Sequence, residues 1–99
     1  MDGHPNESVR VHIWVKGHVQ GVAFRAHVEY FALQIGVSGW VRNVGWDTVE
    51  CIAEGTRAQT DQFIETVKQG PRAARVNEAR VEYETATGEF DGFIVKHSL

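Results

Sequence analysis

The sequence predicts an α+β domain, in which one mostly antiparallel sheet carries two helices on one of its faces. The first observation is the order of two hydrophobic patterns. Segments with a period of two, typical of strands, and segments with a helical period follow one another as strand, helix, strand, strand, helix, strand. The second is the length of 99 residues, which suits one domain with a modest core and is too short for two.

The first strand is expected to begin near Val9. The preceding residues, 1–8, show no periodicity and little to bury, so we expect a flexible N-terminal tail. From Val9 to Val15 every second residue is apolar, which indicates a strand with one face in the core. A helix over residues 22–35 follows, ended by Gly36. Its apolar stripe consists of Phe24, Val28, Phe31 and Ile35.

A β-hairpin and a second helix are predicted next. Residues 37–44 and 48–54 each alternate in polarity, and the short link between them indicates a hairpin. Thr56, followed three residues later by Gln59, is a capping-box pattern that opens a helix. We expect Gly70-Pro71 to end this helix, because proline cannot continue it.

A fourth strand is predicted over residues 76–83, with Ala79, Val81 and Tyr83 facing inward. Phe93 to Lys96 can form a short fifth strand at an edge of the sheet. The resulting βαββαβ order is the split βαβ, or ferredoxin-like, arrangement.

This topology makes the loop after Val15 a neighbour of Asn43. The crossover through the first helix makes the first and second strands parallel, so both end at the same edge of the sheet. If the third strand lies between them, their separation is two strand spacings, roughly 10 Å. An arginine side chain can span that gap.

The composition is that of an ordinary soluble protein, with 42% hydrophobic and 23% charged residues. No apolar run is long enough for a membrane helix, and the polar N-terminus resembles neither a signal nor a transit peptide, so we expect a cytoplasmic protein without membrane contact. Cys51 is the sole cysteine and is interpreted as a small buried residue. The net charge of −3 gives no overall attraction for polyanions, so any phosphate binding must be local.

The loop between the first strand and the first helix has a residue pattern that can form an anion-binding site. Gly17 and Gly21 permit positive φ, so several N–H groups can point inward at the start of a helix. Arg25, in the first helical turn, can reach the same anion with its guanidinium. On spacing alone, a tight turn with Arg25 paired to a surface acid is an equally good interpretation. The ATP-binding and dinucleotide-binding loop patterns are both absent.

Two longer motifs resemble those of a known family. VKGHVQGVAFR at residues 15–25 resembles the first signature of the acylphosphatases, small enzymes that hydrolyse carboxyl-phosphate anhydrides. GWVRN at 39–43, with Val49 and Gly55, resembles the second. The resemblance implies that Arg25 binds the phosphate and that Asn43 positions the attacking water. It implies a phosphate-binding loop of Gly17, His18, Val19, Gln20, Gly21 and Val22.

The resemblance covers residues 9–97 and implies a single acylphosphatase-like domain over 9–99. It further implies a small-molecule acyl phosphate substrate and a monomer, and we expect neither a cofactor nor a metal, because the histidines are scattered without zinc-site spacing. Asp47 stands where the family has glycine in the hairpin. We expect an altered hairpin rather than a lost site, because Gly45 can absorb a shifted turn.

Two other functions remain open at this stage. The open face of the sheet is expected to carry aromatic and basic residues, as RNA-recognition modules do, but also four glutamates: Glu50, Glu54, Glu78 and Glu82. The second alternative keeps the fold and the phosphate site without turnover, as a binding module of the kind joined to larger proteins. The presence of both Arg25 and Asn43 favours an enzyme.

Overall fold

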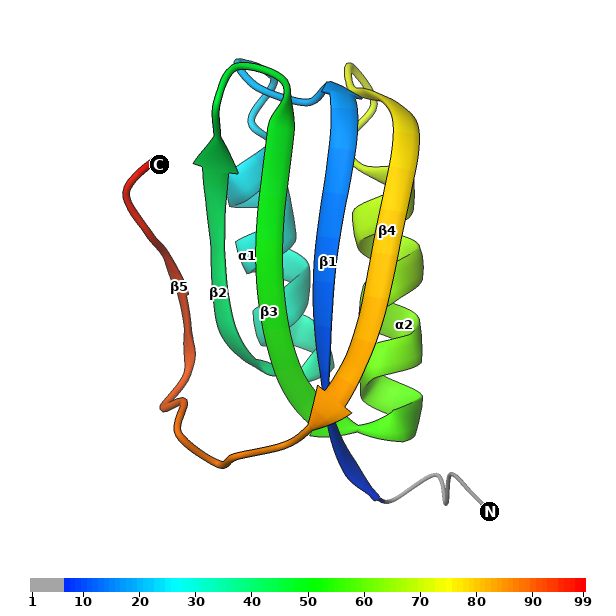
Figure 1. The fold of residues 1–99 in the computed structure, drawn as a ribbon, viewed down its shortest axis with the longest axis vertical. Coiled ribbons are helices and arrows are strands. Elements are labelled where there is room, and N and C mark those ends of the chain that lie inside the picture. Colours follow the sequence, from blue (N-terminus) through cyan, green and yellow to red (C-terminus); the bar gives the residue numbers. More distant parts are fainter. Residues whose placement is uncertain (1–6) are drawn as a thin grey trace.

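The structure, a computed structural model, describes residues 7–99. Its elements follow the predicted order, and the short fifth strand expected at an edge of the sheet is present. They are β1 (Ser8–His18), α1 (Phe24–Ile35), β2 (Ser38–Val44), β3 (Thr48–Thr56), α2 (Arg57–Gln69), β4 (Arg75–Thr85) and β5 (Phe93–Val95). The sheet order is β4-β1-β3-β2-β5, and only β2 and β5 pair in parallel. Both helices cover the same face of the sheet (Figure 1), so the ferredoxin-like prediction is confirmed.

The first strand is longer than predicted at both ends. It begins at Ser8, and residues 1–6 of the predicted tail lie outside the described residues. At its other end, Gly17 and His18 still pair with β4 after a register shift, so they belong to the strand rather than to the loop. A Cβ atom on Gly17 would collide with the carbonyl oxygen of Arg75. The close approach of β4 therefore accounts for this glycine.

Both helices end where the sequence indicates. α1 begins two residues later than expected, and Gly36 ends it in the left-handed conformation with φ 96°. At the start of α2, the Gln59 N–H donates to Thr56 Oγ1 at 3.1 Å and the Thr56 N–H donates to Gln59 Oε1 at 2.9 Å. This reciprocal pair is the predicted capping box, and Gly70 ends the helix. In the described chain, no helix is long and apolar enough to cross a membrane.

The core lies between the sheet and the two helices. Alternate residues of β1 (Val11, Ile13 and Val15) are fully buried against the helices, as the period-two pattern predicts. Cys51 is also buried, and burial together with Glu50 raises the pKa of its thiol far above the ordinary value. The thiol therefore stays protonated and unreactive, in agreement with its interpretation as a small core residue.

β4 faces the helices as predicted, but it is less buried than expected. Ala79, Val81 and Tyr83 pair with the buried β1 residues Val15, Ile13 and Val11, yet Ala79 and Tyr83 are exposed because β4 is an edge strand. The Tyr83 ring lies under the guanidinium of Arg57, 4.5 Å from it, and its hydroxyl donates to Asp61 at 3.3 Å. Tyr83 thus packs over the outer side of α2 instead of entering the core.

Glu54 is a nearly buried carboxylate on the open face of the sheet. Burial alone would raise the pKa of Glu54, but donors from Thr87, Arg10 and Gly88 outweigh burial and hold this pKa below its ordinary value. The Arg10 Nε to Glu54 Oε2 distance is 2.7 Å. Glu54 therefore ties the loop after β4 to the centre of the sheet.

We expect this carboxylate to make folding sensitive to acid. Because the folded-state pKa of Glu54 is lowered, its stabilisation is complete above the unfolded-state pKa and is lost as the pH falls through the folded value. Glu54→Gln should lower the free energy of unfolding at pH 7 by about 1–3 kcal/mol and flatten the decline below about pH 5. Urea unfolding from pH 3 to 7 measures this, with the exposed Glu65→Gln as control. Parallel curves for wild type and Glu54→Gln would contradict it.

Candidate active site

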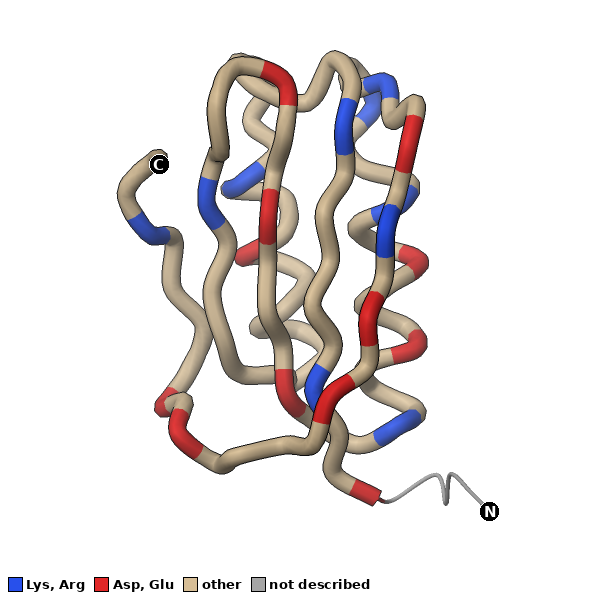
Figure 2. The backbone as a smooth tube through the Cα atoms, viewed as in Figure 1, with Lys and Arg blue, Asp and Glu red and all other residues tan. Residues whose placement is uncertain are grey.

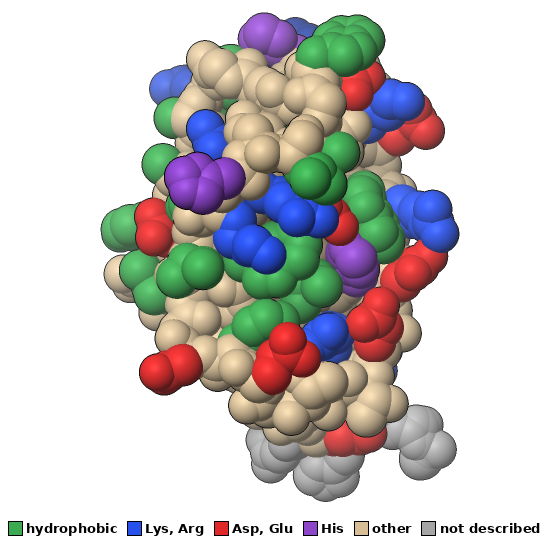
Figure 3. All heavy atoms as spheres, turned by 60° about the vertical axis from the view of Figure 1, so that its left-hand side comes forward, with side chains coloured by type: hydrophobic (Ala, Val, Ile, Leu, Met, Phe, Trp, Pro, Cys, Tyr) green, Lys and Arg blue, Asp and Glu red, His purple; other side chains and the backbone are tan. Residues whose placement is uncertain are grey.

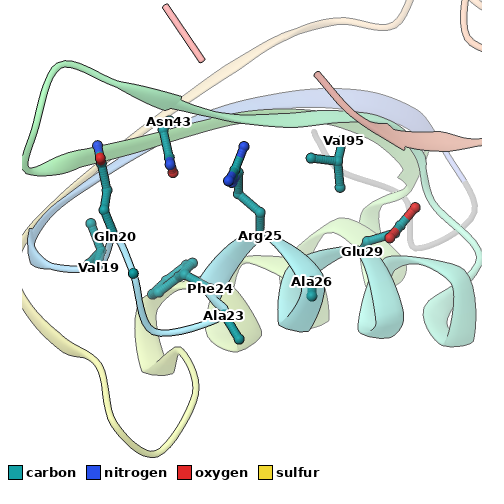
Figure 4. A pocket seen from close by; sticks show the side chains of 10 residues that line it. Val19, Gln20, Ala23, Phe24, Arg25, Ala26, Glu29, Asn43 and Val95 are labelled. Carbon is teal, nitrogen blue, oxygen red and sulfur yellow. The ribbon is translucent and has the colours of Figure 1, made fainter. Parts of the chain in front are cut away.

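A pocket of about 310 Å³ opens where β1 and β2 end and α1 begins. Asn43 is paired with Val49 of β3, which is paired in turn with Val15 of β1. The expected closeness of the loop and Asn43, with the third strand between, is thereby confirmed. The pocket is lined by Val19, Gln20, Gly21, Ala23, Phe24, Arg25, Ala26, Glu29, Asn43 and Val95 (Figure 4).

The loop over residues 19–23 turns its backbone toward this pocket. Val19 is fully buried and fixes the loop to the core. Gly21 has φ 76°, and a Cβ atom there would meet nothing within 4 Å, so the space beside it is open. The N–H groups of residues 20–26 donate to no oxygen of the described chain, and α1 has no side-chain N-cap. A run of free N–H groups at a helix start is an anion cradle.

The backbone of Ala23, at the centre of this cradle, is strained. Ala23 is the N-cap of α1 and, within residues 7–99, the one non-glycine residue with positive φ, at 60°. The left-handed conformation costs an alanine about 1–2 kcal/mol relative to the right-handed one. Such strain is typical of functional sites, where the surrounding structure imposes it.

Removing this strain should stabilise the fold. Ala23→Gly is expected to raise the free energy of unfolding by about 0.5–1 kcal/mol, because relief of the left-handed strain exceeds the entropy that glycine adds to the unfolded chain. Urea denaturation of wild type and variant measures it. Ala58→Gly, on an exposed turn of α2, should change the stability in the opposite direction. Destabilisation by both substitutions would show that Ala23 is not strained.

Arg25 supplies the positive charge of the pocket. It is half-buried and makes no hydrogen bond or ion pair with any residue from 7 to 99. In Figure 4 its side chain rises from α1 toward the sheet, between Asn43 of β2 and Val95 of β5. Glu29, one helical turn further on, also lines the pocket but is not paired with it. The guanidinium is thus free to bind an anion in the cradle.

Asn43 contributes a free side-chain amide on the opposite wall. Its backbone is held on both sides, by pairing with Val49 and by the Leu99 N–H, which donates to the Asn43 carbonyl oxygen at 2.8 Å. Its side chain has no partner among the described residues. The amide can therefore accept a hydrogen bond from one small molecule and donate to another.

The structure brings most, but not all, of the predicted site residues together. Val19, Gln20, Gly21, Arg25 and Asn43 line the pocket. Three others do not: Gly17, His18 and Val22.

The two strand residues among these three lie elsewhere. The N–H of Gly17 is already used, because it donates to the carbonyl oxygen of Asp47 at 2.9 Å. Gly17 and His18 line a separate hollow beside Trp46, on the other side of the hairpin. No group of three or more His, Cys, Asp or Glu residues in the described chain is placed to hold a metal ion.

Five lining residues are not among the predicted site residues: Ala23, Phe24, Ala26, Glu29 and Val95. Glu29 follows Arg25 by four positions, so its place on the same helical face could have been found. Val95 could not have been found, because its position depends on the parallel pairing of β5 with β2.

The hairpin accommodates Asp47 by an altered turn, as expected. Gly45 takes the left-handed position with φ 61°, whereas Asp47 has no positive φ. The Asp47 side chain accepts a hydrogen bond from Thr48 Oγ1 at 2.9 Å, and its carbonyl accepts from Gly17. The turn is therefore shifted onto Gly45, and Asn43 stays in register with β3.

Free N–H groups and an unpaired arginine around one pocket of a ferredoxin-like domain are features typical of small oxyanion-binding proteins. The family model for acylphosphatases matches residues 11–95. An acylphosphatase of Syntrophus aciditrophicus (strain SB) is 49% identical over 84 residues, covering 85% of this chain and 88% of that protein. The chain therefore belongs to the acylphosphatase family, whose members are hydrolases.

Solved structures agree with this assignment. The crystal structure of acylphosphatase from Bacillus subtilis is similar with a TM-score of 0.85 and 32% identity, over 89% of this chain and 98% of that one. Full-length HypF, in a phosphate- and nucleotide-bound form, is similar with a TM-score of 0.85 and 26% identity. That similarity covers 98% of this chain but 13% of HypF, so the same fold also occurs as a small part of a longer protein.

Proposed function

We propose that this protein hydrolyses acyl phosphates to a carboxylate and inorganic phosphate. The observation that supports this most directly is the meeting of three free groups at one pocket. These are the N–H groups of residues 20–26, the guanidinium of Arg25 and the side-chain amide of Asn43. The substrate class follows from membership of the acylphosphatase family.

The cradle and Arg25 would bind the phosphate group. Phosphoryl transfer needs positioning and stabilisation of charge on the equatorial oxygens more than it needs covalent help from the protein. The N–H groups are fixed before the substrate arrives, so little reorganisation accompanies the reaction. Arg25 would act as an electrostatic group that binds the phosphate, not as a base.

Asn43 would hold the attacking water. Its amide oxygen accepts a hydrogen bond from the water, and its NH₂ group donates to the substrate or to the loop, which fixes in-line attack. The water oxygen bonds to phosphorus, and the bond from phosphorus to the acyl oxygen breaks. The electron pair leaves with the carboxylate, whose conjugate acid has a pKa of about 4, so no general acid is needed. The water proton passes to a phosphate oxygen.

The nucleic-acid alternative is weakened by the open face of the sheet. Trp14 and Trp40 lie there, but each ring is covered by the protein's own cation: Arg80 is 5.0 Å from Trp14 and Arg42 is 4.7 Å from Trp40. Acidic residues of β3 and β4 lie beside these basic residues (Figure 2). Figure 3 shows the same mixture of charges around an apolar area near the β5 edge. A face of mixed charge with covered rings is poorly suited to stacking bases.

The binding-module alternative rests on the similarity to a small part of HypF. A binding module would have the same phosphate cradle as the proposed enzyme but no turnover. A measurement of activity therefore distinguishes the two functions. The monomeric state, the cytoplasmic location and the single domain over residues 9–99 stay predictions from the sequence.

Hydrolysis of benzoyl phosphate, followed by its ultraviolet absorbance, tests the proposal. We expect turnover in the presence of a chelator, competitive inhibition by inorganic phosphate, and a pH profile of kcat without a histidine-like limb. A protein that binds phosphate but does not turn over benzoyl, acetyl or carbamoyl phosphate would support the binding module instead. A limb near pH 6.5 that is lost in His18→Ala would contradict proton transfer to the substrate.

A further inference from the structure

The side chain of Gln20 connects the phosphate loop to the β2–β3 hairpin. Its Nε2 donates to the carbonyl oxygens of Thr48 at 2.9 Å, Gly45 at 3.1 Å and Val44 at 3.4 Å. These carbonyls surround the turn that directly follows Asn43. All three acceptors are oxygens, so the NH₂ end of the amide, and not Oε1, must face the hairpin.

These contacts use both N–H donors of the Gln20 side chain. An NH₂ group has two hydrogens and here meets three acceptors, so one hydrogen is shared between two carbonyls. No side-chain N–H of Gln20 remains for a phosphate oxygen. Its side chain therefore differs in role from the backbone around it, whose N–H groups are free.

Few other contacts fix the loop relative to the hairpin. Among the described residues, no backbone hydrogen bond joins residues 19–22 to the rest of the chain, and the bond from Gly17 to Asp47 lies before the loop begins. Val19 is buried and holds the inner side of the loop in the core. Gln20 holds the side that faces the hairpin, and in Figure 4 it reaches up beside Asn43.

We propose that Gln20 is a positioning residue that fixes Asn43 relative to the bound phosphate. This rests on the proposed function, in which Asn43 holds the attacking water. The phosphate is bound by the cradle and Arg25, which do not need the hairpin. In-line attack does need it, because the water is held from β2 and the phosphate from the loop. A displacement of about 1 Å between the two can cost on the order of a hundredfold in rate.

Removal of the Gln20 donors should therefore lower kcat and leave phosphate binding nearly unchanged. Gln20→Met keeps the length without donors and adds no charge beside the phosphate. For this variant we expect kcat for benzoyl phosphate to fall roughly 30-fold, while KM and the inhibition constant of inorganic phosphate change less than about threefold. Gln62→Met, on an exposed turn of α2, is the matched control and should leave both unchanged. Thermal unfolding shows that each variant is folded.

A double-mutant cycle with Asn43→Ala separates positioning from a general structural role. If Gln20 acts through Asn43, Gln20→Met should change kcat less than about threefold in the Asn43→Ala background. An equal loss in both backgrounds, an unchanged kcat in the single variant, or a phosphate inhibition constant raised as much as kcat is lowered would each overturn the proposal. Unchanged kcat in Asn43→Ala alone would instead overturn the role of Asn43 itself, and so the two failures are distinguishable.

Discussion

Arg25→Gln should reduce kcat/KM for benzoyl phosphate roughly a thousandfold and raise the inhibition constant of inorganic phosphate. The glutamine can still donate a hydrogen bond, but it carries no charge and cannot bind two equatorial oxygens at once. Removal of one charge-stabilising donor costs about 10²–10³ in rate, and loss of a transition-state arginine costs more. Steady-state kinetics with phosphate as inhibitor measures both effects.

Arg25→Gln should affect anion binding without disturbing other interactions within the protein. Arg25 pairs with no described residue, so its loss leaves no buried carboxylate behind, and the variant should unfold within a few degrees of wild type. Arg25→Lys retains the charge but lacks the paired N–H donors of a guanidinium, and it should recover part of the phosphate binding. Arg72→Gln, an exposed arginine after α2, is the control. Retention of more than a tenth of wild-type kcat/KM in Arg25→Gln would rule out a central role for Arg25.

The fold could be predicted because local signals and long-range order agree. The period-two pattern of β1, the capping box of Thr56 and the glycine at 36 each fix one element without knowledge of the others. Their order then leaves few topologies, since a strand-helix-strand crossover is almost always right-handed. What local patterns could not give was the depth of burial at the edge of the sheet. Tyr83 alternates like a core residue and faces the helices, yet it stays exposed on the edge strand β4, against Arg57 and Asp61 of α2.

The site could be predicted in part for the same reason. The topology brought the loop and Asn43 together, and the helix start placed Arg25 between them. The two glycines looked alike in sequence, but only Gly21 faces the pocket, whereas Gly17 is required by the approach of β4. That difference lies in a register shift between two strands distant in sequence, which no local pattern encodes. The link from Gln20 to the hairpin is hidden for the same reason, because it depends on three carbonyl groups.

Asn43→Ala should lower kcat about 10²- to 10³-fold while changing the phosphate inhibition constant less than about threefold. The reason is that phosphate binding and water positioning are done by different groups. The cradle and Arg25 bind the phosphate of the substrate, whereas the Asn43 amide positions the water, which matters only as attack begins. Leu99 and Val49 hold the backbone at residue 43 whatever its side chain, so the variant should stay folded. Asn77→Ala, on β4 beside the separate hollow, is the matched control. If Asn43→Ala instead weakened phosphate binding as much as it lowered kcat, the amide would be a phosphate ligand, and the water would have to be oriented by the substrate itself.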